Sequence, residues 1–92
     1  MELKWTSKAL SDLTRTYAFL ASVNQVAAAR AVQSLTNAPA SLLVNPRLGE
    51  SLEEFEPREV RRILVAHYEI RYEIQKSTIY VLRLWHTREN RK

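Results

Sequence analysis

The chain contains no cysteine and a single glycine among its 92 residues, and each scarcity excludes a class of site. Without cysteine there is no disulfide scaffold and no thiolate-bound metal. One glycine cannot supply the glycine-rich loop that cradles a phosphate group. No long apolar run is present, so we expect no membrane-spanning helix. The first ten residues, MELKWTSKAL, carry charged side chains in place of an apolar stretch, which predicts no signal peptide and, by default, a cytoplasmic protein.

The composition is typical of a globular protein, with an excess of basic residues. Hydrophobic residues make up 46% and charged residues 26% of the chain, which is long enough for one small core, so we expect a single domain over residues 1–92. The formal net charge is +4, and ten of the 14 cationic residues are arginine. Residues 47–60 hold five glutamates against two arginines, whereas residues 61–92 hold eight cations against three glutamates. An arginine-rich surface favours anionic partners, and the alternative is a charge that serves solubility alone.

Caps and periodicity predict a strand and two helices in the first half of the chain. Residues 3–6 are typical of a short strand. Thr6 or Ser7 is a suitable helix N-cap, and apolar residues then recur at spacings of three and four, which predicts a helix over about residues 8–22. A second N-cap, Asn24, precedes an alanine-rich helix. Because only a few residues separate the two helices, we expect an antiparallel hairpin.

Prolines mark the middle of the chain. Pro39 predicts a kink or break in the second helix, with helical turns resuming toward Leu43. The sequence Asn-Pro-Arg-Leu-Gly at residues 45–49 is typical of a turn. The acidic segment that follows it, as far as Pro57, is expected to be a connector with little regular structure.

Alternation predicts three strands in the last third. Apolar and charged residues alternate with a period of two over residues 68–75, which indicates a sheet with one buried face. The run after it is apolar on nearly both faces, as in an internal strand. The three expected strands are residues 60–66, 68–75 and 79–85. We therefore expect an α+β fold of two layers, in which the helical hairpin covers one face of an antiparallel sheet of about four strands.

Placing the apolar residues on one face also predicts how the last two strands pair. The expected partners are Ile74–Tyr80, Glu73–Val81, Tyr72–Leu82, Arg71–Arg83, Ile70–Leu84, Glu69–Trp85 and Tyr68–His86. One face then packs against the helices, and the other faces away from them. The outward face brings unlike chemistry together and is the candidate functional surface: Glu69, Arg71, Glu73, Arg83 and Trp85.

Several segments, taken in order, resemble one known family. They are LKWTSKALSDL at residues 3–13, LLVNPRLG at 42–49, REVRR at 58–62, YEIRY at 68–72, IYVL at 79–82 and HTR at 86–88. Their order and spacing over most of the chain resemble the toxins of the RelE/ParE superfamily. The resemblance implies a small toxin of a type II toxin–antitoxin system, held inactive by an antitoxin encoded beside it. The fold that it implies agrees with the architecture predicted above.

The superfamily divides by target, and two features of this sequence favour one branch. ParE-type toxins bind DNA gyrase, whereas RelE-type toxins cut mRNA on the ribosome. Glu69 stands where RelE-type nucleases usually carry arginine, and residues 50–57 hold four glutamates and no lysine, so a phosphate group would be repelled. We therefore expect a ParE-type toxin that inhibits gyrase by contact, with no cofactor and no metal. The predicted target-binding residues are Arg71, Arg83, Trp85, Arg88 and Arg91.

Other interpretations stay open. In a ribosome-dependent mRNA endonuclease, His86 would be the general acid or base, and Arg83 and Arg88 would stabilise the charged phosphorane. Alternatively, His86 is a hydrogen-bonded residue at a strand end, and the arginines of the outward face pair with the glutamates beside them. A chain that binds its antitoxin without being toxic is a third possibility.

The expected partners follow from the same resemblance. They are an antitoxin, acidic in part and disordered until bound, together with gyrase, or the ribosome and mRNA in the alternative. A homodimer or a toxin–antitoxin hetero-oligomer is the expected assembly, and no membrane is involved.

Overall fold

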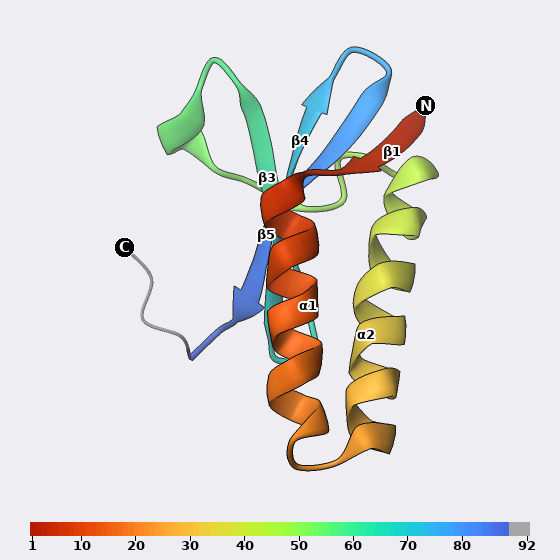
Figure 1. The fold of residues 1–92 in the computed structure, drawn as a ribbon. Helices are drawn as coiled ribbons and strands as arrows, with labels where there is room; N and C mark the ends of the chain where they lie inside the picture. The colour runs from red at the N-terminus through yellow and green to blue at the C-terminus, as the bar shows by residue number, and fades with distance from the viewer. Residues whose placement is uncertain (89–92) are drawn as a thin grey trace.

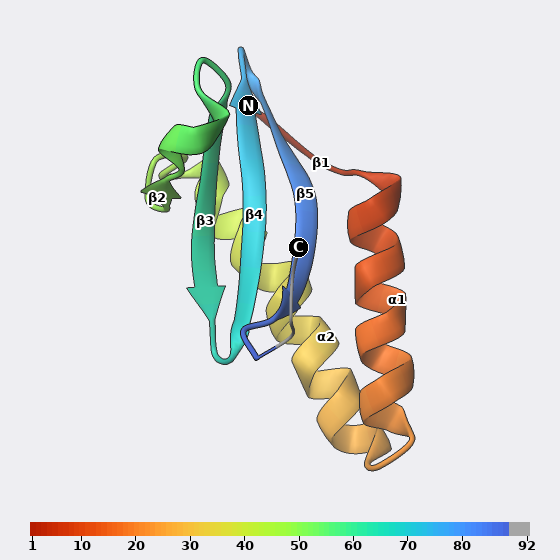
Figure 2. The same ribbon diagram turned by 90° about the vertical axis from the view of Figure 1, so that its left-hand side faces the viewer.

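The structure of the chain, a computed structural model, describes residues 1–88 and places a helical hairpin against one face of a five-stranded sheet (Figures 1 and 2). The elements in chain order are β1 (Glu2–Trp5), α1 (Ser7–Ala21), α2 (Gln25–Ala40), the 3₁₀ turn η1 (Ser41–Leu43), β2 (Glu50–Ser51), the 3₁₀ turn η2 (Glu53–Phe55), β3 (Glu59–Val65), β4 (Tyr68–Gln75) and β5 (Thr78–His86). This arrangement confirms the expected two-layer α+β fold. Within residues 1–88, neither helix is both long enough and apolar enough to span a membrane.

Both helices begin at the predicted caps. The Thr6 hydroxyl accepts a hydrogen bond from the Ala9 amide at 3.1 Å, and the Asn24 side chain accepts one from the Ala27 amide at 3.0 Å. These bonds satisfy amide groups that have no partner within the first turn of a helix. There is no break at Pro39, because α2 continues to Ala40, but helical turns do extend toward Leu43 as expected, in η1. Pro39 is near the end of the helix, so its missing amide costs one bond of the last turns.

The sheet is mixed, with strand order β1-β5-β4-β3-β2. The pairs among β2, β3, β4 and β5 are antiparallel, as expected, but β1 is parallel to β5. Parallel neighbours need a long crossover connection, and here the helical hairpin lies in the chain between β1 and the rest of the sheet. The expectation of an entirely antiparallel sheet of about four strands therefore missed one strand and one direction.

A β-bulge interrupts the pairing of β4 with β5, and the predicted register holds on only one side of it. Four pairs are as predicted: Arg71–Arg83, Ile70–Leu84, Glu69–Trp85 and Tyr68–His86. Between Arg71 and Tyr72 the register shifts by one residue. The observed pairs are then Tyr72–Val81, Glu73–Tyr80 and Ile74–Ile79, so the expected pairs Tyr72–Leu82, Glu73–Val81 and Ile74–Tyr80 are wrong.

The bulge has a packing reason. An extra residue in one strand lets that strand change which side chains face the core. Ile79 and Val81 therefore join Leu84 in the buried layer, and all three are inaccessible to solvent. Leu82 is the extra residue on β5, and its carbonyl accepts a hydrogen bond from the Thr6 hydroxyl at 2.9 Å.

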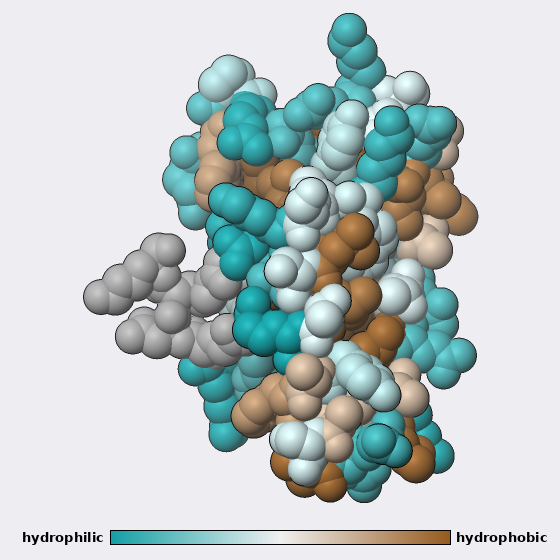
Figure 3. Space-filling model, in the orientation of Figure 1, coloured by the Kyte–Doolittle hydropathy of each residue, from teal (hydrophilic) through white to brown (hydrophobic). Residues whose placement is uncertain are grey.

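The core lies between the helices and the inner face of the sheet. One cluster joins Ala9 of α1 and Leu35 of α2 to Ile70, Val81 and Leu84. A second cluster lies nearer the end of α2: Leu42, Tyr72, Ile74 and Ile79. Apolar side chains also remain on the outside of the hairpin, where Figure 3 shows brown surface among the polar residues.

The acidic connector has more structure than expected. It forms β2, which pairs with β3, and η2. The Arg62 guanidinium binds Glu50 of β2 at 2.8 Å. At the start of this segment the backbone of Gly49 lies close to β4, because its amide donates a hydrogen bond to the Tyr72 hydroxyl at 3.0 Å. A Cβ on Gly49 would lie 2.5 Å from the Arg62 carbonyl oxygen, so only glycine fits.

Candidate functional site

The outward face of the sheet carries an arginine held between two aromatic rings. The guanidinium carbon of Arg71 lies 4.8 Å from the ring centroid of Trp85 and 5.2 Å from that of Phe55 in η2. Such contacts are attractive because the ring face is electronegative. Trp85 is only 5% exposed. Arg71 and Trp85 therefore meet on this face, as predicted, and Phe55 is a member that the sequence did not point to, because its segment was interpreted as an irregular connector.

Two buried glutamates on the same face are bound to arginines. Glu73 receives two hydrogen bonds from Arg58, at 2.7 and 3.1 Å. Arg62 and Arg71 contact Glu69 at 3.3 and 3.4 Å. The hydrogen bonds from Arg58 hold the pKa of Glu73 below its usual value against the opposing effect of burial. The outward face thus offers arginine–carboxylate pairs, and its cations already have anionic partners.

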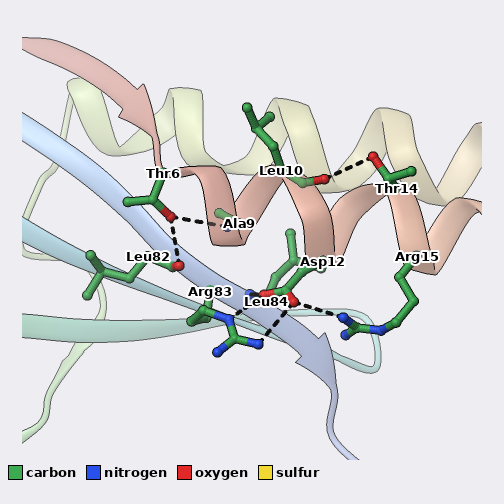
Figure 4. A network of polar contacts seen from close by, with 9 residues as sticks. All are labelled: Thr6, Ala9, Leu10, Asp12, Thr14, Arg15, Leu82, Arg83 and Leu84. Carbon is green, nitrogen blue, oxygen red and sulfur yellow. Dashed lines mark hydrogen bonds and ion pairs between the residues drawn. The ribbon is translucent and has the colours of Figure 1, made fainter.

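Arg83, the second arginine predicted on the outward face, reaches α1 and not the glutamates of that face (Figure 4). Its Nε and Nη2 atoms donate to the two oxygens of Asp12 at 2.7 and 3.1 Å. The Leu84 amide also donates to Asp12 at 3.0 Å, and Arg15 does so at 2.9 Å. Burial alone would raise the pKa of Asp12, but the hydrogen bonds from Arg83, Leu84 and Arg15 lower it below its usual value. Asp12 is therefore a buried carboxylate anion that holds α1 to β5.

Asp12 was missed because its position near the start of α1 already had an explanation, the favourable interaction of a negative charge with the helix dipole. The overlooked signal is the spacing of Ala9, Asp12 and Thr16, the three buried residues of α1. These positions share one helix face, so Asp12 points inward. β1 pairs with β5 only as far as Val81, and beyond that point the carboxylate accepts the hydrogen bond that a neighbouring strand would have accepted.

His86 ends β5 inside an aromatic cluster. It pairs with Tyr68 in the predicted register, and the two rings meet edge to face with centroids 5.2 Å apart. The His67 ring stacks on His86 at 5.9 Å. The Nδ1 atom of His86 accepts a hydrogen bond from the Arg88 amide at 3.1 Å. This is the hydrogen-bonded strand-end position that was one interpretation of His86.

An open depression of about 470 Å³ lies beside this cluster, between α1 and the adjoining ends of β4 and β5. It is lined by Arg15, Thr16, Phe19, Tyr68, His86 and Arg88; we name it the α1–β5 depression. The structure thus brings together His86 and Arg88 of the endonuclease alternative, whereas Arg83 is engaged by Asp12. Arg91, the remaining predicted target-binding residue, lies outside the described residues. Within residues 1–88, no three His, Asp or Glu side chains gather as metal ligands would.

Comparison with known proteins identifies the family. The model of the ParE toxin of the parDE type II toxin–antitoxin system matches residues 3–91. This chain belongs to the ParE toxin family. A solved structure described as the chromosomal ParDE toxin–antitoxin system from P. aeruginosa is similar, with a TM-score of 0.77 and 25% sequence identity. That similarity covers 94% of this chain and 95% of the other. A search of curated protein sequences gave no match.

Membership of the ParE family confirms the resemblance drawn from the sequence segments and the preference for the ParE branch. The ParE fold also accounts for the two helices and the mixed sheet of this chain. The chain is therefore a toxin of a type II toxin–antitoxin system.

Proposed function

We propose that this ParE-family toxin acts in the cytoplasm by binding DNA gyrase and halting its cycle, and that an antitoxin neutralises it by binding the toxin directly. The observation that carries the proposal is the match of the ParE toxin model to residues 3–91. The toxin itself neither makes nor breaks a covalent bond in this mechanism. It binds gyrase through arginine and aromatic side chains, which are common anchors of protein interfaces.

The arrangement of charges on the outward face favours inhibition by protein contact over RNA cleavage. Cleavage needs cations placed to stabilise a negatively charged phosphorane. On the outward face Arg58 binds Glu73, and Arg62 and Arg71 bind Glu69. A phosphate would have to displace these carboxylates, whereas a protein surface can be accommodated beside them.

The test is a supercoiling assay with purified gyrase and purified toxin. We expect saturating toxin to abolish supercoiling of relaxed plasmid. Arg88→Glu should weaken inhibition because Arg88 is an exposed, predicted target-binding residue. Arg30→Glu is the matched control, since Arg30 is an exposed arginine on α2. Normal supercoiling at saturating wild-type toxin would refute gyrase inhibition.

The endonuclease alternative draws on the presence of His86 and Arg88 at one depression, and a single variant separates it from our proposal. We expect His86→Gln to arrest growth as the wild type does, because the glutamine carbonyl can still accept a hydrogen bond and no proton transfer is required. The measurement is growth after induction without antitoxin, with circular dichroism as the check on folding. A folded His86→Gln toxin that no longer arrests growth would favour the endonuclease.

A further inference from the structure

We propose that the guanidinium of Arg71, held between the rings of Phe55 and Trp85, binds a carboxylate that the target protein of the toxin supplies. We name this place the Arg71 slot. The inference rests on the proposed function in taking gyrase as the protein that supplies the carboxylate. It adds the side chain that makes the contact, the chemical group that it binds and the rings that hold it in position.

Arg71 uses few of its hydrogen-bond donors. Arg58 and Arg83 each bind a carboxylate through two hydrogen bonds of 3.1 Å or less. The guanidinium of Arg71 makes a single hydrogen bond within residues 1–88, from Nη2 to Glu69 at 3.4 Å. A guanidinium has five N–H donors, and 27% of the Arg71 side chain is exposed. The cation is therefore only partly satisfied, and part of it is open to a ligand.

The Nε atom of Arg71 adds a second sign of an incomplete site. It is buried and has no hydrogen-bond partner within residues 1–88. Buried polar groups in folded proteins nearly always have a partner, so an exception needs an explanation. Arginine commonly binds the two oxygens of a carboxylate through two parallel N–H donors. A carboxylate at this guanidinium would supply the charge-assisted hydrogen bonds that Arg71 lacks.

Two aromatic rings hold the guanidinium in place. Its carbon atom lies 4.8 Å from the Trp85 ring centroid and 5.2 Å from the Phe55 ring centroid. Trp85 belongs to β5 and Phe55 to η2, which precedes β3, and β4 lies between β3 and β5 in the sheet. A side chain that is already fixed loses little conformational freedom on binding. Arg71 is therefore a preorganised donor, and Phe55 is a positioning residue that acts through it.

The surroundings of the slot favour a protein carboxylate over a chain of phosphates. Glu69 and Glu73 lie on the same face, and η2 carries the exposed side chains of Glu53 and Glu54. A nucleic acid would bring a series of negative charges toward these glutamates, whereas one carboxylate brings a single charge to the guanidinium. Arginine is also a frequent anchor of protein interfaces. The ligand is therefore an aspartate or glutamate side chain, or the carboxyl terminus, of a protein.

The slot itself is tested with acetate as the probe. Sodium acetate is added to ¹⁵N-labelled wild-type toxin at constant ionic strength, with sodium chloride as the balancing salt, and NMR follows the Nε–H resonance of Arg71. We expect a saturable shift with a dissociation constant on the order of 10 mM. The matched control is the Nε–H resonance of Arg30, an exposed arginine on α2, which should show no saturation.

The same titration with inorganic phosphate distinguishes the two anions. We expect phosphate to bind Arg71 more weakly than acetate, because the neighbouring glutamates repel its larger charge. An Arg71 resonance that shows no saturable shift with acetate would overturn the proposal. Tighter binding of phosphate than of acetate would assign the slot to nucleic acid and overturn it too.

The role of the slot in target binding is tested by calorimetry with gyrase holoenzyme and purified toxin variants. Arg71→Lys keeps the positive charge but loses the planar fork, and it should raise the dissociation constant about tenfold or more. Phe55→Leu keeps an apolar side chain but removes the ring, and it should weaken binding less, by about threefold. Arg30→Lys is the matched control and should bind within about twofold of the wild type. Circular dichroism checks that each variant is folded.

Failure of the slot and failure of gyrase as the target give different results. Unchanged gyrase affinity in a folded Arg71→Lys toxin would overturn the role of the slot. A wild-type toxin that does not bind gyrase would refute the proposed function, and growth after induction without antitoxin then tests the slot. Weaker arrest by Arg71→Lys than by Arg30→Lys would support it, and equal arrest by the two variants would overturn it.

Discussion

At the scale of single residues, Asp12 links two elements of the fold through its buried carboxylate. Its carboxylate accepts hydrogen bonds from two side chains and one backbone amide, so it joins α1 to β5 in two ways (Figure 4). A buried charge is tolerated only when it is paired and hydrogen-bonded. Removing the charge would leave Arg83 beside a neutral group in a largely buried place.

Asp12→Asn should therefore destabilise the fold. Asparagine keeps the shape of the side chain but replaces one acceptor oxygen with a donor that faces a guanidinium. We expect the free energy of unfolding to fall by about 2–3 kcal/mol, measured by urea denaturation. The control is Glu2→Gln, which removes an exposed ion pair with Lys4 and should change stability by less than about 0.5 kcal/mol. Equal stability of the Asp12→Asn variant and the wild type would show that the carboxylate does not hold α1 in place.

Residue patterns predicted part of the candidate site. Arg71 and Trp85 were assigned to one face because alternation fixes which side a strand residue faces, and that assignment needs no knowledge of other elements. Arg83 was assigned to the same face, but its long side chain reaches a carboxylate from a different element, 71 residues away in the chain. A contact over such a separation depends on how α1 packs against β5, which local patterning does not encode.

At the scale of elements, Thr6 is the joint between β1, α1 and β5. Its amide donates to the Val81 carbonyl at 3.0 Å, and its hydroxyl donates to the Leu82 carbonyl at 2.9 Å. The same hydroxyl accepts from the Ala9 amide at 3.1 Å as the cap of α1. One side chain thus starts a helix and ties it to the bulged part of the sheet.

Thr6→Ala should cost more stability than Asn24→Ala, although both remove one N-cap. An N-cap is worth about 1 kcal/mol, and Thr6→Ala also deprives the Leu82 carbonyl of its donor, for a total of about 2 kcal/mol. Asn24→Ala removes only the cap bond of α2 among the contacts described. The measurement is the free energy of unfolding of the two variants in urea. Equal losses would mean that the bond from Thr6 to Leu82 contributes nothing.

The helices were predictable because caps and periodicity are local signals, and Thr6 and Asn24 carry them plainly. The bulge in β5 was not, because Val81 and Leu82 are both apolar and either could face the core. Only the packing of Ile79 and Val81 against the helices decides between them. The parallel direction of β1 also depends on the whole chain path, since a four-residue strand has no signal for its direction.

At the scale of the whole molecule, buried and half-buried carboxylates bound to arginine link distant parts of the chain. Burial would raise the pKa of Asp12, but its hydrogen bonds from Arg83, Leu84 and Arg15 lower it. The hydrogen bonds from Arg58 lower the pKa of Glu73. A group with a lower pKa in the folded chain than in the unfolded chain stabilises the fold above its unfolded pKa. That contribution is lost as the pH falls through the folded pKa.

The toxin should therefore unfold more easily in acid. We expect the free energy of unfolding to be nearly constant between about pH 7 and pH 5 and to decline below about pH 4, where carboxylates gain protons. The Asp12→Asn variant should lose less stability over this range, since it lacks one of the titrating groups. Urea denaturation at a series of pH values measures both slopes. Parallel curves for the variant and the wild type would contradict the assigned state of Asp12.

The proposed function requires that this ParE-family chain poisons gyrase by contact and cuts no RNA. The most direct measurement maps DNA breaks and mRNA ends in the same cells after the toxin is induced without its antitoxin. Gyrase poisoning predicts growth arrest with gyrase-dependent breaks in DNA and mRNA ends like those of uninduced cells. Intact DNA with new cuts inside translated mRNA, or no arrest at all, would contradict it.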